Sequence, residues 1–281
     1  MTGILVLTLK LAVGALILAI GMGSRLSDLT YLWRRPSLLL RSLLAMYVVV
    51  PAAAFVLAKA LPVAPGVKAA LLVLAVSAGA PLLPRKLGKL GGSGAFVFSL
   101  VVTSSLLAIV LVPAWIALLN RHFDTSAQAS PAAVAELVAK AFLLPLLAGM
   151  AARALAPKFG EWLADRLLAA AGIVLAVAAL MLLVTHRELF LEIRWSDMAA
   201  LAGLMALAIA IGHALGGPAP ETRAALAIAC ATRHIAVAIL VASAFPGPRT
   251  TVLMLSYFLA SAAVSIPYLR WQGSRSQAAR R

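Results

Sequence analysis

The sequence predicts an all-α polytopic membrane protein. Of its 281 residues, 63% are hydrophobic and only 12% are charged, and the mean hydropathy is +1.03. In a soluble domain, about a quarter of the residues are charged. A chain this apolar has too little polar surface to cover itself in water, so lipid is expected to be its solvent. Nine apolar segments of about 20 residues, the length that crosses the hydrocarbon, support this class.

The nine segments follow one another with only short polar breaks between them. They run approximately over 3–22, 37–61, 67–90, 93–119, 133–155, 162–184, 196–216, 221–245 and 248–270. Prolines and glycines fill the breaks, where the backbone can leave a helix in water. No soluble domain fits between the segments. We therefore expect one transmembrane domain over 1–281, ending in a polar cytoplasmic tail at 271–281.

Individual segments carry further signals. The first starts at Ile4 with no basic stretch before it, so it is predicted to be a membrane span rather than a cleavable signal peptide. The second contains Pro51, and the fourth closes near Pro113. Lys140 lies in the fifth segment, and its side chain is expected to snorkel towards the outer surface.

Basic residues set the expected orientation. With nine spans, 15 of the 24 Lys and Arg residues lie on one side and 8 on the other, while Arg233 lies inside a span. The positive-inside rule makes the first side cytoplasmic. The N-terminus is then outside and the C-terminus inside a bacterial inner (plasma) membrane. The net charge of +15 follows from these loops, so we expect the lipid bilayer, and no nucleic acid, as a partner.

Two of the segments, 67–90 and 221–245, are similar to each other at a constant offset of 155 residues. Each begins with a basic residue, Lys68 or Arg223, followed by an alanine-rich apolar run. The loop before the first is expected outside and the loop before the second inside. The two copies would therefore run in opposite directions, as in the inverted repeats of many secondary transporters.

Both copies are interrupted near their middle. Pro81 and Pro84 interrupt the first, because proline has no backbone N–H to continue the helix ladder. The polar run Thr232-Arg233-His234 interrupts the second. Matched interruptions predict two broken helices that cross near the midplane and build a substrate site. The alternative is that the two prolines merely kink one helix.

Several short motifs connect the chain to a known family. They are Gly21-Met22-Gly23, Pro51, the Pro81 region with Gly91-Gly92-Ser93-Gly94, the hydroxyls of Ser99, Thr103, Ser104 and Ser105, Pro113, and 231–238. Their order over nearly the whole chain resembles the bile acid:sodium symporter family, in a superfamily that also holds arsenite and riboflavin transporters. The resemblance implies a transporter and not an enzyme, built from a panel of outer helices and a core with two crossing broken helices.

The resemblance also implies how the repeats divide. Family members usually have ten spans in two inverted five-helix repeats. Nine spans imply that the first is missing. The first repeat then covers about 1–120 and lacks one helix, and the second covers about 131–270.

The chain departs from the sodium-coupled members at the positions that hold their ions. Those members have a glutamate and a glutamine on the second crossing helix, a Ser-Asn pair after the first break, hydroxyls on the next span and a glutamine before the proline of the second span. The matching positions here are Ala229, Arg233, Leu83-Pro84, Val97 with Val101, and Met46. Sodium needs several oxygen ligands. The resemblance therefore predicts that sodium is not the coupling ion and that no metal or cofactor is bound.

Arg233 is the leading candidate site residue. An arginine at the midplane is costly and persists only with a partner or a purpose. Its guanidinium could replace sodium as the cation that offsets the carbonyl dipoles of the crossover, or bind a substrate carboxylate in bidentate fashion. His234 could carry a coupling proton, and a satisfied core histidine is the alternative.

Hydroxyl groups complete the candidate site. Thr232 and Ser77 are expected to line the breaks, and Ser99, Thr103 and Ser104 to face them from the next span. Hydroxyls in membrane helices also bond their own backbone or a neighbouring helix, which is the structural alternative. Together with Pro81, Arg233 and His234 these side chains form the predicted substrate-binding set.

The sequence thus predicts a secondary-active or facilitative transporter of a small organic anion, without obligatory sodium and with proton coupling open; it predicts no oligomeric state. Alternatives are an ordinary sodium-dependent symporter, an arsenite-type efflux permease with Cys230 as a soft ligand, and a non-transporting descendant. Gly91-Gly92-Ser93-Gly94 also resembles the nucleophile motif of rhomboid intramembrane proteases. That chemistry needs a histidine within hydrogen-bond reach of Ser93. The motifs of zinc proteases and ATP-binding loops are absent from the sequence.

Overall fold

The computed structural model describes residues 2–77, 94–123, 131–185, 187–188, 193–232, 257 and 264–274. Within these ranges every regular element is a helix, which confirms the all-α class. Three helices there are long and apolar enough to cross a membrane: Pro36–Ala60, Gly94–Trp115 and Trp195–Leu215. Leu11–Gly23 and Pro65–Val76 are shorter apolar helices. The full set of nine spans stays a prediction.

The helices follow the predicted segments in order. They are α1 (Thr2–Gly23), α2 (Leu26–Leu29), α3 (Pro36–Leu44), η1 (Ala45–Val49), α4 (Val50–Ala60), α5 (Pro65–Val76), α7 (Gly94–Phe123), α8 (Pro131–Val138), η2 (Ala139–Leu143), α9 (Leu144–Leu155), α10 (Pro157–Thr185), α12 (Trp195–Leu215) and α13 (Pro220–Ala231). A last helix covers 264–274. Many of them begin at a proline, whose missing N–H would have no partner in the first turn of a helix anyway.

Apart from the interruptions in the third and eighth segments, three boundaries differ from the prediction by four or five residues. The fourth segment is expected to end at 119 and to close near Pro113, but Pro113 lies inside α7, which continues to Phe123. The sixth segment was expected to start at 162, but α10 starts at Pro157. The added residues 157–161 include Lys158 and Glu161 and are exposed except at Gly160, so a search for apolar residues places the start of this helix too late. The last helix runs to 274, four residues into the expected polar tail, because Gln272 is buried there and donates to the carbonyl of Pro220 at 3.2 Å.

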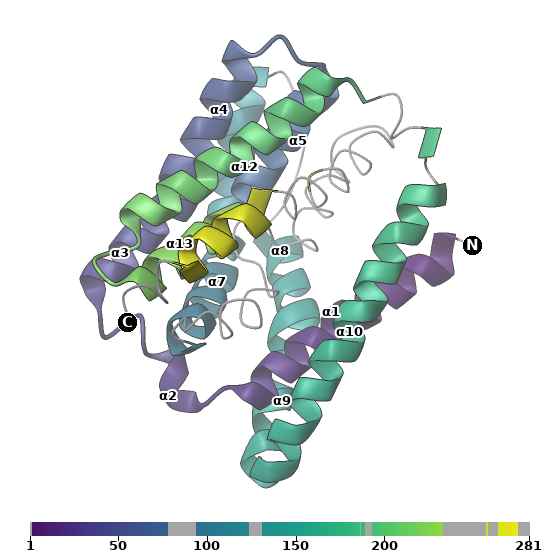
Figure 1. The fold of residues 1–281 in the computed structure, drawn as a ribbon, viewed down its shortest axis with the longest axis vertical. Helices are drawn as coiled ribbons and strands as arrows, with labels where there is room; N and C mark the ends of the chain where they lie inside the picture. The colour runs from purple at the N-terminus through teal and green to yellow at the C-terminus, as the bar shows by residue number, and fades with distance from the viewer. Residues whose placement is uncertain are drawn as a thin grey trace.

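The helices fall into two groups. Figure 1 shows α1, α9 and α10 lying together, with α1 packed along both of the others. The second group contains α3–η1–α4, α5, α7, α12 and α13, in which α12 packs on α13 and on α4. We call them the α1 group and the α12 group. The short helix α2 links the two groups and packs on α7.

Small residues bring the helices of the α1 group into close contact. A Cβ on Gly21 would lie 2.2 Å from the carbonyl oxygen of Leu146, and a Cβ on Gly149 would lie 2.1 Å from that of Leu18. The backbones of α1 and α9 therefore touch, as small residues allow in membranes, where association depends on close packing. On α10, Ala164, Ala171 and Ala178 repeat every seven residues and are all buried, which gives the helix a narrow contact face.

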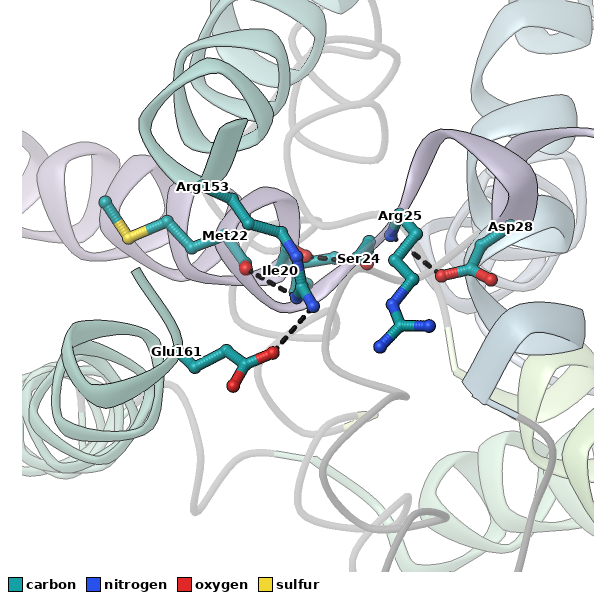
Figure 2. A network of polar contacts seen from close by, with 7 residues as sticks. All are labelled: Ile20, Met22, Ser24, Arg25, Asp28, Arg153 and Glu161. Carbon is teal, nitrogen blue, oxygen red and sulfur yellow. Dashed lines mark hydrogen bonds and ion pairs between the residues drawn. The ribbon is translucent and has the colours of Figure 1, made fainter. Parts of the chain in front are cut away.

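Arg153 ties the three helices of this group together (Figure 2). From α9 its Nη1 donates to the carbonyl of Met22 at the end of α1, at 3.0 Å. Its Nη2 lies 2.7 Å from the carboxylate of Glu161 on α10. The side chain of Arg153 is only 14% exposed, whereas that of Glu161 is 59% exposed. The bond to Met22 is thus the better shielded of the two.

Two helices of the fold contain a π-helical turn directly before a proline. η1 ends at Val49 and is followed by Pro51, and η2 ends at Leu143 and is followed by Pro145. Because Pro51 has no N–H, it cannot donate to the carbonyl of Tyr47 four residues earlier. The indole N–H of Trp115 donates to that carbonyl instead, at 2.8 Å. A neighbouring helix therefore supplies the donor that the proline lacks.

A tight turn connects α12 to α13. A Cβ on Gly212 would lie 2.6 Å from the Cα of Ala227, so these two helices also touch through their backbones. Gly217 has a φ of +83°, a conformation that favours glycine. Arg223 Nε donates to the carbonyl of Gly217 at 2.6 Å.

His213 is bonded to the hydroxyl of Tyr268 on the last helix at 2.8 Å, as expected for a satisfied histidine.

Candidate substrate site at two helix breaks

The two segments predicted to be copies form helices of the same length. α5 and α13 each have 12 residues and begin with proline, Pro65 and Pro220. The residues before them, Ala64 and Ala219, have ψ angles of 149° and 130° respectively. The starts of the two helices are 155 residues apart, the same offset that relates their sequences. The local structure of the two segments therefore agrees as closely as their sequences.

Both helices also end in the same way. Ser77 has φ −83° and ψ 54°, and its hydroxyl donates to the carbonyl of Val73 at 2.7 Å. Thr232 has φ −87° and ψ 140°, and its hydroxyl donates to the carbonyl of Ile228 at 2.7 Å. These backbone angles leave the helical region. The helices thus end at these hydroxyl residues, where a mere kink would have continued into the next turn.

The ends of both helices are buried among apolar side chains. Ala75 and Ala231 are fully buried and belong to one continuous hydrophobic cluster. A helix carries about half a negative charge at its C-terminus, which is poorly screened in apolar surroundings. The hydroxyl of Tyr257 donates to the carbonyl of Ala231 and so offsets part of the negative charge at the end of α13. The site is electrostatically suited to a cation or to hydrogen-bond donors.

Several predicted site residues lie outside the described residues: Pro81, Leu83, Pro84, Arg233 and His234. Their roles stay predictions. Within the described part, Ser77 is buried and Thr232 is half-buried at the two breaks, and both hydroxyls bond their own helix. Ser93 of the protease-like motif also lies outside the described residues.

The hydroxyls of Ser99 and Ser104 on α7 bond backbone carbonyls, which is the structural alternative to a role in the site. All three, Ser99, Thr103 and Ser104, are buried. Ser99 Oγ donates to the carbonyl of Leu29 at 2.8 Å and accepts from the amide of Leu32 at 3.1 Å. Through these two hydrogen bonds, Ser99 holds the segment around α2, which links the two helix groups, against α7. Ser104 Oγ donates to its own helix at 3.1 Å, and Thr103 keeps its predicted role untested.

Four of the positions that the resemblance matches to sodium ligands lie within the described residues, and their side chains are apolar. Met46, Val97, Val101 and Ala229 are at most 2% exposed and belong to the same hydrophobic cluster. None of these side chains carries an oxygen atom. Among the described residues there is also no group of three His, Cys, Asp or Glu side chains placed to hold a metal ion.

Cys230 lies next to the second break and is fully buried. It is the one cysteine of the sequence. A soft thiolate site for arsenite would need further sulfur ligands. The chain cannot supply them by itself, so nothing at this position favours the permease alternative.

Two supporting residues were missed by the sequence analysis. Tyr257 bonds the end of α13, and Trp115 bonds the carbonyl of Tyr47. A signal was available for the second, because Pro51 has no N–H to donate to the carbonyl four residues earlier. For Tyr257, the signal was a polar aromatic side chain within an apolar segment.

Three described helices are long and apolar enough to cross a membrane, which is typical of a membrane protein. The chain matches the sodium bile acid symporter family over residues 10–193, and it belongs to that family. The family consists of transporters and not enzymes, so the protein is a membrane transporter at the level of its family. The match ends before α12, and the second break lies beyond it. No individual curated protein matches the chain significantly.

Proposed function

We propose that the protein transports a small organic anion across a bacterial inner membrane without requiring sodium. The observation that carries this proposal is the apolar filling of the positions where sodium-coupled relatives would bind the ion. The buried side chains at these positions have no oxygen atoms that could bind sodium: Met46, Val97, Val101 and Ala229. Sodium in a dry site without such ligands would keep most of its cost of dehydration.

Arg233 takes the place of sodium in this proposal. It follows directly on Thr232, whose hydroxyl bonds the last turn of α13. A guanidinium next to buried helix C-termini is attracted by their partial negative charge. It is also a planar donor that fits a carboxylate. One side chain can therefore stabilise the crossover and still give the site its preference for an anion.

We further propose that the fold is a nine-span inverted repeat in which the α1 group is the panel and the α12 group is the core. The offset of 155 residues supports it. Added to the bounds of α5, it gives those of α13. The N-terminus would be outside and the C-terminus inside. Alternating access would come from the core moving against the panel.

Transport in proteoliposomes tests the proposal. A panel of radiolabelled mono- and dicarboxylates is offered in sodium or in choline buffer, with and without a pH gradient. We expect at least one carboxylate to accumulate equally in both cations. Arg233→Gln should abolish its uptake, while Arg166→Gln, at the surface end of α10, should leave it unchanged. Uptake that depends on a sodium gradient would contradict the proposal. A response to the pH gradient that His234→Gln removes would identify proton coupling.

A further inference from the structure

A shallow groove lies between α1 and the η2–α9 helix. The groove is open, has a volume of about 500 Å³ and is lined mainly by apolar or small residues, among them Leu11, Gly14, Leu144 and Ala148. One charged side chain, Lys140, also lines it. The groove belongs to the α1 group and lies apart from the two helix breaks.

The groove exists because the two helices meet at one end and separate towards the other. They touch at Gly21 and Gly149. Gly14, two turns earlier on α1, would have nothing within 4 Å of an added Cβ. The π-helical turn of η2, Ala139–Leu143, lies on the same stretch of the opposite helix. The space is thus built into the backbone and needs no side chain to move.

The flanks of the groove face hydrocarbon. Leu11 on α1 is 65% exposed, and Leu144 and Leu147 on α9 are 62% and 56% exposed. In a membrane transporter, exposed leucines along a helix contact lipid acyl chains. The groove is therefore open to the bilayer along its length.

An ion pair lies at one end of this lipid-facing groove. Lys140 Nζ is 2.6 Å from the carboxylate of Glu136, and the two side chains are 71% and 64% exposed. Ionisable residues in membrane helices nearly always face the interior of the bundle or a water-filled cavity. Lys140 lies nine residues after Pro131, about 14 Å along the helix axis. Its side chain reaches back towards Pro131, in the direction of the membrane surface.

We propose that the groove is a binding site for a phospholipid with a primary ammonium headgroup, of the phosphatidylethanolamine type. One acyl chain lies in the groove, the phosphate is bound by Lys140, and the ammonium is bound by Glu136. The charges of the pair are complementary to those of this headgroup. A phosphatidylglycerol headgroup has no cation for Glu136. A phosphatidylcholine headgroup has no N–H to donate. The proposal concerns the membrane-facing surface and is independent of the transported substrate.

The test is native mass spectrometry of the full-length protein in detergent. The protein is titrated with phosphatidylethanolamine, phosphatidylcholine and phosphatidylglycerol of the same acyl chains. We expect phosphatidylethanolamine to bind at least about tenfold more tightly than the other two. Glu136→Gln should remove this preference and shift it to phosphatidylglycerol, because Lys140 then remains without its carboxylate.

Two glycine variants separate groove binding from unspecific association. Gly14→Leu fills the groove without a backbone clash and should weaken binding of phosphatidylethanolamine about tenfold. Gly203→Leu is the matched control, because Gly203 on α12 also has nothing within 4 Å of an added Cβ and lies outside the groove. Equal binding of the three lipids, or equal loss in both glycine variants, would overturn the proposal. So would a dimer that Gly14→Leu dissociates, because the groove would then be occupied by a second copy.

Discussion

Ser77 and Thr232 close two helices of 12 residues with the same hydrogen bond. Each hydroxyl donates at 2.7 Å to the carbonyl four residues earlier, Val73 in one helix and Ile228 in the other. The two hydroxyl residues are 155 positions apart, which is the offset of the two similar segments. The two helices also share their length of 12 residues and a proline at their start. The proposed site depends on this pair of ends.

The bond between Trp115 and the carbonyl of Tyr47 should replace the helical bond that Pro51 cannot make. We expect Trp115→Phe to lower the stability by about 1–3 kcal/mol, because a buried acceptor loses its donor. Pro51→Ala restores an N–H four residues after Tyr47. The double variant should therefore be more stable than Trp115→Phe alone, as measured by thermal unfolding in detergent. Simple additivity of the two changes would show that the indole and the missing amide are unrelated.

Ser99 and Ser105 form a matched pair of buried hydroxyls on α7. Ser99 has two backbone partners in the linker, whereas Ser105 Oγ has no hydrogen-bond partner among the described residues. We expect Ser99→Ala to cost about 1–3 kcal/mol and Ser105→Ala to be neutral or stabilising. Thermal unfolding distinguishes them. If Ser99→Ala instead left stability unchanged and weakened substrate binding, the original prediction that Ser99 faces the site would be correct.

Arg153 should matter more through the carbonyl of Met22 than through Glu161. The ion pair with Glu161 is largely exposed on the carboxylate side, and such pairs contribute at most about 1 kcal/mol. We therefore expect Glu161→Gln to change stability little. Arg153→Met should cost about 1–3 kcal/mol, because it leaves a shielded carbonyl at the end of α1 without its charged donor. Equal effects of the two variants would assign the stabilisation to the ion pair.

The order and approximate limits of the helices could be predicted because apolar length and proline positions carry that information locally. α5 ends at Val76 and α13 at Ala231, within the segments predicted to be interrupted. The partners of Ser99 could not be predicted. They lie 70 and 67 residues away, in a loop whose path over α7 depends on tertiary packing. The start of α10 was missed because its first residues, 157–161, include Lys158 and Glu161 and are exposed except at Gly160.

Some features of the candidate site could likewise be predicted from the sequence, and others could not. The apolar character of Met46 and Ala229 was plain from the sequence, and their burial in one cluster is what the structure adds. The π-helical turns had no clear signal, because a proline alone does not distinguish a kink from an inserted residue. The bond from Tyr257 to Ala231 joins residues 26 positions apart and depends on tertiary packing, which the local sequence pattern does not determine.

The most direct test of the central claim is the thermal stabilisation of purified protein by carboxylates, with sodium or choline as the cation. A ligand at a hundred times its dissociation constant adds about 2.7 kcal/mol to the stability of the folded state. We expect one carboxylate to stabilise the wild type equally in either cation, and Arg233→Gln to abolish the shift. Stabilisation by sodium alone, or a carboxylate shift that requires sodium, would contradict the account and identify the protein as a sodium-coupled symporter.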